Sequence, residues 1–375
     1  MARPMNPDAP PPASLTIRIP ADWEPHACCW MSWAVHPEWK DWVDVIKSEL
    51  AMVIRAVAQF ERVCLFTAPD QKADAKARFG GGNIEIIEAQ VDDIWMRDIA
   101  PTFALRGSEV IAIDWNFDAW NKGEKRPARA GDRLAQSSHE VFGVARLCAP
   151  FVAEGGAIIT DGRGTLITTR SCLINSRRNR TRCGENQQQL IERGLKTFGV
   201  RKVIWLEGDS SEPVTSGHVD GFAMFAAPAT VLVDVMDDLD IEVPTWREND
   251  IATLEQSRDA QGQTVQVVRV SGPRQRHWKF RGALWAPCYL NAYVSNGAVV
   301  TAKFGDDERD EAARKALAEA FPGRAVVMLR IDHICNGGGG IRCLTQPMPL
   351  SSSAQDFGST SGRSSRCLQS QHDAA

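Results

Sequence analysis

The sequence predicts an α/β fold built from repeated units of a helix followed by a strand. The first observation is that stretches with apolar side chains at helical spacing alternate with short runs of apolar, often β-branched residues, which are typical of strands. The second is that three of the strands are followed, about a dozen residues later, by a segment rich in polar residues. Such segments can converge on one site. The pattern leaves an ordinary α/β sheet with polar loops open as the alternative.

The units follow one another along the chain. Residues 40–60 carry apolar side chains at helical spacing, and the strand Val63–Phe66 follows. Four more pairs come after it: a short helix near 71–79 with Ile84–Ile87, a helix near 185–198 with Val203–Leu206, one near 249–259 with Val265–Val270, and one near 307–320 with Ala325–Arg330. The pattern therefore predicts five units that share a rhythm and negligible sequence identity.

Composition bounds the class of protein. The chain has 375 residues, 43% of them hydrophobic, and a net charge of −4, which gives no reason to expect nucleic acid or an anionic membrane as a partner. No apolar run is long enough for a membrane span, and the Pro-rich start is no secretory signal, so we expect a cytoplasmic protein. Residues 1–14 and the Ser-rich residues 350–375 are expected to be disordered, around a single domain at 15–349.

Ten cysteines occur and none forms a C-x-x-C pair, so most are expected to be buried, reduced thiols. Cys343 differs from the rest because it follows the four glycines Gly337–Gly340. Glycines allow close backbone approach to a ligand and, on this interpretation, leave the cysteine exposed. The alternative is a flexible turn before a buried cysteine.

His218 and Asp220 form a His-x-Asp pair. If the segment is extended, both side chains point to the same face, since the strand period is two. A carboxylate can bind a cation while the imidazole moves a proton. The alternatives are a loop histidine whose ring nitrogens form only structural hydrogen bonds, and a metal site.

Two further segments contain candidate residues. Trp95 and Asp98 lie in DDIWMRD, where a carboxylate can grip a guanidinium through two hydrogen bonds and an indole face adds cation–π attraction. The alternative there is a solvated acidic loop in which Arg97 pairs internally. Glu154 precedes two glycines and can orient a histidine, and Asp161-Gly162 indicates a hairpin turn.

Together these motifs resemble the agmatine deiminase family of guanidine-modifying enzymes. The matching segments run in order over about residues 15–349: ADWEPHACCWMSW, DDIWMRDIAPTF, IDWNFDAWN, EGGAIITDGRGTLITT, CLINSRRN, GHVDGFAMF, YLNAYVSNGAVVTAKFGD and GGGGIRCLTQ. The resemblance implies a five-bladed, pseudo-symmetric α/β propeller, the pentein fold, with a central active site. It also implies a homo-oligomer, expected to be a dimer.

The resemblance also implies site residues and a reaction. Cys343 is expected to be the nucleophile, His218 the general acid and base, and Asp98 and Asp220 the guanidinium ligands, with Glu154 as a further acidic partner. The implied reaction converts agmatine and water to N-carbamoylputrescine and ammonia, on a route to putrescine, through a covalent S-amidino intermediate. It requires no metal and no organic cofactor.

Arg342 departs from the family, which usually has histidine directly before the nucleophilic cysteine. A cation beside Cys343 is expected to favour the thiolate and to disfavour a cationic substrate. On that basis we expect Arg342→His to raise agmatine turnover.

Other functions stay open on the same residues. Peptidyl-arginine deimination and amidino transfer to an amine would use the same side chains, because the far end of the substrate decides between them. A catalytically silent protein that binds guanidino compounds is a third reading, supported by Arg342 and the unfamiliar tail. A metallohydrolase using His218, Asp220 and a cysteine lacks any paired-histidine motif.

Overall fold

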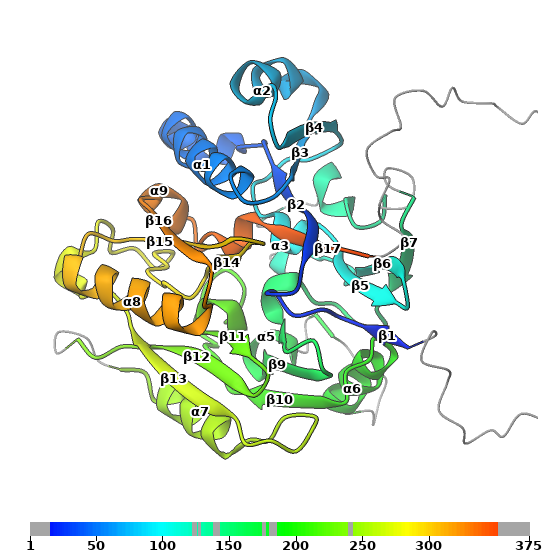
Figure 1. Ribbon diagram of the computed structural model, residues 1–375, viewed down its shortest axis with the longest axis vertical. Coiled ribbons are helices and arrows are strands. Elements are labelled where there is room, and N and C mark those ends of the chain that lie inside the picture. The colour runs from blue at the N-terminus through cyan, green and yellow to red at the C-terminus, as the bar shows by residue number, and fades with distance from the viewer. Residues whose placement is uncertain are drawn as a thin grey trace, which may run out of the picture.

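The computed structural model describes residues 16–351 apart from 122–125, 127–128, 138–142, 175–177, 180–185 and 239–242 (Figure 1). The termini predicted to be disordered, 1–14 and 350–375, lie outside the described residues except for Leu350 and Ser351. Among the helices of the described part, none is long and apolar enough to cross a membrane. All eight described cysteines are free, and all but Cys148 are buried, as expected of reduced core thiols.

The described strands form five sheets, which confirms the predicted α/β class. Two sheets have four strands, in the hydrogen-bonding orders β1 (Ile17–Arg18), β5 (Thr102–Arg106), β6 (Glu109–Asp114), β7 (Ala145–Cys148) and β17 (Gln346–Pro349), β2 (His26–Ser32), β3 (Val63–Thr67), β4 (Ile84–Glu88). Two of the three-stranded sheets have the orders β10 (Lys202–Leu206), β9 (Thr165–Thr169), β8 (Ile159–Thr160) and β11 (Ala223–Ala227), β12 (Thr230–Val235), β13 (Gln266–Ser271). The last has the order β14 (Tyr293–Val294), β15 (Ala298–Ala302), β16 (Ala325–Leu329).

Each sheet repeats one plan. An antiparallel pair is joined by a parallel third strand, as in β11, β12 and β13, where Ala223 faces Val233 and Val231 faces Val267. In the last sheet the antiparallel partner of β2 is β17, so Gln346 near the end of the chain pairs with Trp30 near its start. The C-terminal strand therefore completes the N-terminal sheet.

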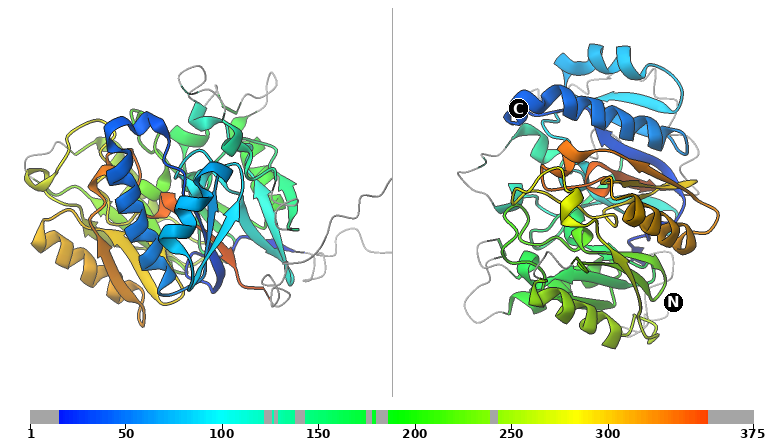
Figure 2. Two further views of the ribbon diagram at one scale, coloured as in Figure 1. Left: turned by 90° about the horizontal axis from the view of Figure 1, so that it is seen from above. Right: turned by 90° about the vertical axis from the view of Figure 1, so that its left-hand side faces the viewer.

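The longer helices connect parallel strands and lie at the periphery of the molecule (Figures 1 and 2). They are α1 (Val43–Ala58), α6 (Gln187–Thr197), α7 (Thr245–Gln256) and α8 (Asp307–Ala320), with the shorter α2 (Lys72–Phe79) at the outer edge. The helix α1 buries Ile46, Leu50 and Val57, members of the apolar series that predicted it. In α8 the Asp306 side chain caps the first turn, which also carries three acidic residues that suit the helix dipole.

Short elements lie between the sheets and carry the polar motifs. They are α3 (Met96–Ile99), α5 (Arg170–Leu173), α9 (Asp332–Cys335) and the 3-10 turns Gly155–Ala157, Val219–Gly221 and Arg342–Leu344. Figure 1 shows α3 near the middle of the molecule. The contacts between α3 and the turns at 155–157 and 342–344 bring distant parts of the chain together.

The five predicted helix-then-strand units are real, but they do not correspond one to one with the five sheets. The first two units belong to the same sheet, because β3 and β4 pair in parallel. The sheet of β5, β6 and β7 was not among the predicted units, since no long helix of the described residues connects β6 to β7. The predicted helix near 249–259 begins earlier, at Thr245, and ends at Gln256.

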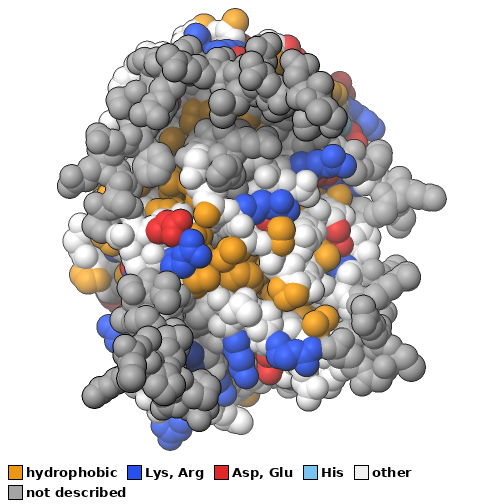
Figure 3. Space-filling model, turned by 90° about the vertical axis from the view of Figure 1, so that its right-hand side faces the viewer, with side chains coloured by type: hydrophobic (Ala, Val, Ile, Leu, Met, Phe, Trp, Pro, Cys, Tyr) orange, Lys and Arg blue, Asp and Glu red, His pale blue; other side chains and the backbone are white. Residues whose placement is uncertain are grey.

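The described surface mixes both signs of charge. The face in Figure 3 shows Lys and Arg side chains beside apolar ones and fewer acidic ones.

Candidate active site

One cavity of about 880 Å³ collects most of the predicted site residues. Five of the six line it: Trp95, Asp98, His218, Asp220 and Cys343. The sixth, Glu154, is fully buried directly behind His218. The volume falls within the range usual for small-molecule sites. The expected convergence of segments from residue 95 to residue 343 is therefore observed.

Cys343 lies in the 3-10 turn Arg342–Leu344, in the wall of this cavity. It is 9% exposed, so the expectation that the glycines leave it exposed was wrong. A Cβ atom added to Gly339 would lie 3.0 Å from the Cys343 sulfur and 2.6 Å from the Trp95 ring. The glycines therefore let the backbone pack tightly against Cys343 and the Trp95 indole.

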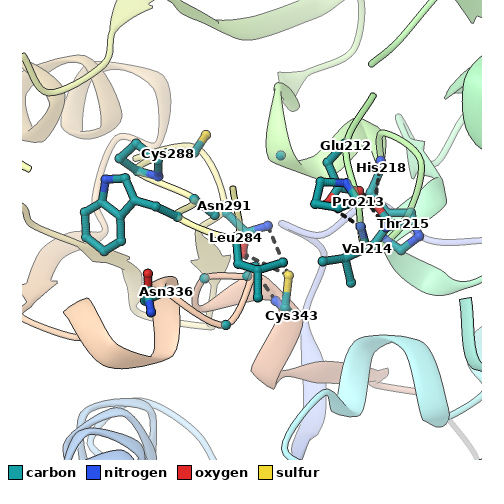
Figure 4. Close-up of a pocket in the computed structure, with 18 of the residues that line it drawn as sticks. Glu212, Pro213, Val214, Thr215, His218, Leu284, Cys288, Asn291, Asn336 and Cys343 are labelled. Atoms are coloured by element: carbon teal, nitrogen blue, oxygen red, sulfur yellow. Dashed lines mark hydrogen bonds between the residues drawn. The ribbon is translucent and has the colours of Figure 1, made fainter. Parts of the chain in front are cut away.

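Asn291 is the direct polar partner of Cys343, and the sequence analysis did not single it out. Its Nδ2 lies 3.3 Å from the Cys343 sulfur, and its Oδ1 accepts a hydrogen bond from the Cys343 backbone N–H at 3.3 Å (Figure 4). Its Nδ2 also donates to the Asp220 carbonyl. The only sequence signal was its place in the matching segment YLNAYVSNG.

Burial controls the protonation of Cys343. Removal from water raises the pKa of the thiol to about 12, and the charges of Asp220 and Asp98 act in the same direction. Hydrogen bonds from Gly340 and Asn291 oppose the rise. The sulfur of the free protein is therefore a thiol at neutral pH.

His218 lies between two carboxylates. Its Nε2 is 3.3 Å from Glu154 Oε2, and its Nδ1 is 3.9 Å from Asp98 Oδ2. Burial opposes the imidazolium charge, but Asp98 and the hydrogen bonds with Cys172 and Glu154 outweigh burial and raise the pKa of His218 well above its usual range. A Cβ on Gly156 would lie 2.4 Å from His218 Nδ1, so the absence of a side chain at Gly156 leaves room for the histidine ring.

The His-x-Asp segment is not extended, which corrects the strand argument. His218 caps the 3-10 turn Val219–Gly221, which contains Asp220. Both side chains still reach the same cavity, as Figure 4 illustrates for His218, seen across from Cys343. The turn, rather than a strand period of two, brings them there.

Asp98 is buried and held from two sides. Its Oδ2 accepts from Trp120 Nε1 at 2.8 Å, and its Oδ1 accepts from the Gly156 backbone N–H at 3.0 Å. Burial raises the pKa of the Asp98 carboxyl; the nearby His218 opposes this and Glu154 adds to it. The alternative of a solvated acidic loop is excluded for Asp98, which is 7% exposed.

Arg342 points away from the cavity that Cys343 lines. Its Nη1 pairs with Asp220 Oδ2 at 2.9 Å, and its Nε pairs with Asp22 Oδ2 at 2.9 Å. The guanidinium also donates to the carbonyls of Gly155 and Ile158. Its charge is thus directed at two carboxylates, and Arg342 does not line the cavity in which a cationic substrate would lie.

Comparisons with known proteins agree with this geometry. The sequence profile of the Porphyromonas-type peptidyl-arginine deiminases matches residues 18–349. The chain belongs to this family. It is 35% identical to the agmatine deiminase of Pseudomonas aeruginosa (strain LESB58) over 372 residues, which span 92% of this chain and 98% of that protein. The agmatine deiminase of Ectopseudomonas mendocina (strain ymp) is 33% identical, over 90% of this chain and 97% of its own.

A solved structure gives the same result. The agmatine deiminase of Enterococcus faecalis superposes with a TM-score of 0.81 and 27% identity, over 90% of this chain and 97% of its own. The resemblance drawn from the eight motifs is thereby confirmed, together with the mixed α/β architecture that it implied.

Glu154 also binds an arginine that the sequence analysis missed. Arg178 Nη2 hydrogen-bonds Glu154, and Arg178 Nη1 lies 3.4 Å from the Cys172 sulfur. Burial raises the pKa of Glu154, but the charge of Arg178 and the bond from His218 outweigh it and hold that pKa below its usual value. Glu154 therefore stays ionised behind His218.

The alternative of a metal site can be tested on the donor atoms. Among the described residues, Glu154, Cys172 and His218 offer ligand atoms within 4.8 Å of one another. This set differs from the one considered in the sequence, which contained Asp220. Because the Arg178 guanidinium already contacts both Glu154 and Cys172, a metal ion would meet an adjacent positive charge. The cluster of Glu154, Cys172 and His218 therefore does not suit a bound metal ion.

The cavity has an acidic and aromatic lining. Among the described residues, ten carboxylate side chains and four Lys or Arg side chains line it, together with seven tryptophans: Trp39, Trp42, Trp95, Trp120, Trp246, Trp278 and Trp285. Carboxylates attract a cation, and indole faces bind cations and methylene groups alike. The lining therefore suits an extended cationic ligand.

Proposed function

We propose that this protein catalyses the hydrolytic deimination of a guanidino substrate, with agmatine and water giving N-carbamoylputrescine and ammonia. The observation that carries the proposal is the convergence of a cysteine, a histidine and buried carboxylates on one cavity. The agmatine deiminases among its relatives support the choice of substrate. The product lies on a route to putrescine.

Binding of the guanidinium rests on Asp98 and Asp220. Both carboxylates line the cavity, and Arg342 and Trp120 hold them in fixed orientations. A planar guanidinium presents parallel N–H groups that match carboxylate oxygens. The Trp95 indole beside Gly339 offers a face to the bound cation.

The nucleophile is formed when the substrate arrives. In the free protein the pKa of the Cys343 thiol is raised to about 12, so the thiolate is scarce. A bound guanidinium adds a positive charge between Asp98 and Asp220, which reduces the effect that these carboxylates have on the thiol. The thiol proton leaves to solvent, and Asn291 donates its Nδ2–H to the resulting thiolate.

His218 moves the remaining protons. The thiolate attacks the central carbon of the guanidinium, and the His218 imidazolium protonates one nitrogen, which leaves as ammonia. The S-amidino intermediate remains on Cys343. Neutral His218 then takes a proton from water, and the hydroxide adds to the carbon. The carbon–sulfur bond breaks as the Cys343 thiolate leaves, and the hydroxyl proton passes to this thiolate, which restores the thiol and releases the urea product. Glu154, ionised beside Nε2, stabilises the imidazolium in both steps.

We extend the proposal to the arrangement of the five sheets. The five sheets, each with an antiparallel pair and a parallel third strand, are interpreted as the blades of a pseudo-symmetric α/β propeller, the pentein fold. Residues 15–349 form its single catalytic domain. A homodimer and a cytoplasmic location stay predictions.

The competing functions differ in their substrates and acceptors. The reading as a silent binding protein loses one support, because Arg342 is paired with Asp22 and Asp220 and lies off the cavity. Peptidyl-arginine deimination and amidino transfer differ from the proposal at the far end of the substrate.

Ammonia release from agmatine, free arginine and an arginyl peptide, without an added amine acceptor, separates these functions. We expect release from agmatine to exceed the others. Preferred release from the peptide, or turnover that requires an amine acceptor, would overturn the choice of agmatine. Cys343→Ser serves as the inactive control for all three substrates.

A further inference from the structure

Leu284 is an exposed apolar side chain in the wall of the same cavity, outside the groups used in the mechanism. It is 43% exposed. Among the described residues, the other large apolar side chains with comparable exposure, Met52, Val268 and Leu350, do not line this cavity. Because apolar surface in contact with water is unfavourable in proportion to its area, an apolar group of a ligand that covers Leu284 gains binding free energy.

The chain on both sides of Leu284 is anchored, so its exposure follows from the fold. Trp285 is 8% exposed, and its backbone N–H donates to the Gly282 carbonyl at 3.0 Å, which closes a turn around Leu284. The Ala286 N–H donates to the Cys335 carbonyl at 3.1 Å, at the end of α9. Leu284 therefore lies on a fixed turn at the cavity rather than on a free loop.

Val214 adds a second apolar side chain from a distant part of the sequence. A Cβ added to Gly338 would lie 3.1 Å from Val214 Cγ2 and 3.8 Å from the Leu284 carbonyl oxygen, so both residues border Gly338. The loop that carries Val214 is fixed by Glu212, whose carboxylate accepts from the backbone N–H groups of Val214 and Thr215. Two anchored segments therefore bring apolar side chains to the same glycine.

This apolar pair lies beside the reacting sulfur. A Cβ added to Gly339, the next residue after Gly338, would lie 3.0 Å from Cys343 Sγ. Because consecutive Cα atoms are about 3.8 Å apart, the side chains that border Gly338 are neighbours of this sulfur. Figure 4 shows Leu284 and Val214 on either side of Cys343. A hydrocarbon group on a guanidinium whose carbon lies at the sulfur can therefore contact both side chains.

We propose that Leu284 and Val214 form an apolar subsite for a hydrocarbon group of the substrate, so that this protein also deiminates N-alkylguanidines, which carry no second charge. The inference rests on the proposed function and adds a class of substrate to it. Asp98 and Asp220 bind the guanidinium as before, and burial of methylene groups against the subsite supplies the remaining binding free energy. The reaction is unchanged, since an N-alkylguanidinium and water give an N-alkylurea and ammonium.

Several carboxylates of the cavity wall already have partners within the protein. Glu212 is bound by backbone N–H groups of its own loop. Arg129 donates to Asp93 at 2.9 Å, and Arg309 pairs with Asp237 at 2.9 Å. A substrate with an uncharged chain end therefore does not leave these carboxylates without a partner.

The test is a series of N-alkylguanidines of increasing chain length, from ethylguanidine to hexylguanidine. In the native protein we expect kcat/KM for ammonia release to rise roughly fourfold for each added methylene, the factor for burying one such group. In Leu284→Ala and in Val214→Thr the rise should fall below roughly twofold per methylene, whereas Leu284→Met should retain most of it. Met52→Ala, at a similarly exposed apolar position of α1 away from the cavity, should leave the series unchanged.

Two outcomes would overturn the inference. Values of kcat/KM that stay flat along the series in the native protein would mean that no methylene group is buried on binding. A loss in Leu284→Ala that is equal for every chain length would mean that Leu284 has only a structural role. The native series needs no variant to fold, so it decides the question even if a substituted protein is unstable.

A failure of the proposed function would be recognised separately. If the native protein releases no ammonia from any guanidino compound, deimination is wrong. Calorimetric binding of the same N-alkylguanidines to Cys343→Ser, with and without Leu284→Ala, then tests the subsite without catalysis. Affinity that rises with chain length and loses this dependence in the double variant supports the subsite. Binding that is absent, or independent of chain length, overturns it.

Discussion

Arg342 and Asp220 form a buried ion pair, with 2.9 Å between Nη1 and Oδ2. Arg342 is 3% exposed and Asp220 is 1% exposed. The residue that directly precedes Cys343 in the sequence therefore pairs with Asp220, a carboxylate that lines the cavity. A second carboxylate, Asp22, holds the other edge of the same guanidinium.

This geometry reverses the effect expected for Arg342→His. Removing one partner of a buried ion pair leaves an uncompensated charge and costs about 3–5 kcal/mol. We expect a lower melting temperature and a lower kcat/KM for agmatine, since Asp220 loses its anchor. Arg342→Lys, which keeps the charge but not the planar fork, should lose less. Turnover of Arg342→His at or above the native level would show that Asp220 needs no anchor.

Asn291→Ala should act on the nucleophile rather than on substrate binding. The variant removes the Nδ2–H that lies 3.3 Å from the Cys343 sulfur, while Asp98 and Asp220 remain. We expect kcat to fall roughly 10- to 100-fold, as for the loss of one hydrogen bond to a charged group, with a small change in KM. Asn291→Asp should be worse, because a carboxylate disfavours the thiolate. An unchanged kcat in Asn291→Ala would show that Asn291 does not stabilise the Cys343 thiolate.

Glu154→Gln should lower the pKa of His218. In the native protein that pKa is raised, and Glu154 is one of the groups that raise it, so a neutral amide must shift it downward. The imidazolium would then be lost at a lower pH, and the alkaline limit of activity would move with it. Titration of the His218 ring by NMR, compared with the native protein, checks the direction. An unchanged or higher pKa would contradict the role given to Glu154.

Much of the site could be predicted because its chemistry is local in the sequence. Asp98, His218, Asp220 and Cys343 lie in short motifs whose residue types already suggest guanidinium binding and acid–base work. Asn291 could not be found in this way, since its partners Asp220 and Cys343 lie far from it in the sequence. Arg178 was missed because no residue type or spacing in its segment indicates that its guanidinium contacts Glu154 and Cys172.

The same distinction applies to the fold. Helices α1 and α8 were predicted within a few residues because their apolar spacing or capping residues are local signals. The grouping of strands into sheets depends on pairing across long distances, so the shared sheet of β3 and β4 and the pairing of β17 with β2 were not predicted. The pairing of Arg342 with Asp22 could not be predicted for the same reason, because the two residues lie near opposite ends of the chain.

Activity should survive removal of metal ions. The Arg178 guanidinium contacts Glu154 and Cys172 of the cluster that these two residues form with His218, and the proposed steps are carried by side chains alone. We expect ammonia release from agmatine to be unchanged after dialysis against a chelator. Loss of activity that zinc or another divalent ion restores would favour the metallohydrolase.

The central claim is that Cys343 forms a covalent bond to the guanidinium carbon. In His218→Ala the attack can still occur, but ammonia departure and water activation are slowed, so an intermediate should accumulate. Quenched reactions of this variant with agmatine, analysed by intact-protein mass spectrometry and peptide mapping, should show the mass of agmatine minus ammonia on Cys343, and Cys343→Ser should show neither adduct nor turnover. An adduct on another cysteine, or full activity of Cys343→Ser, would contradict the account.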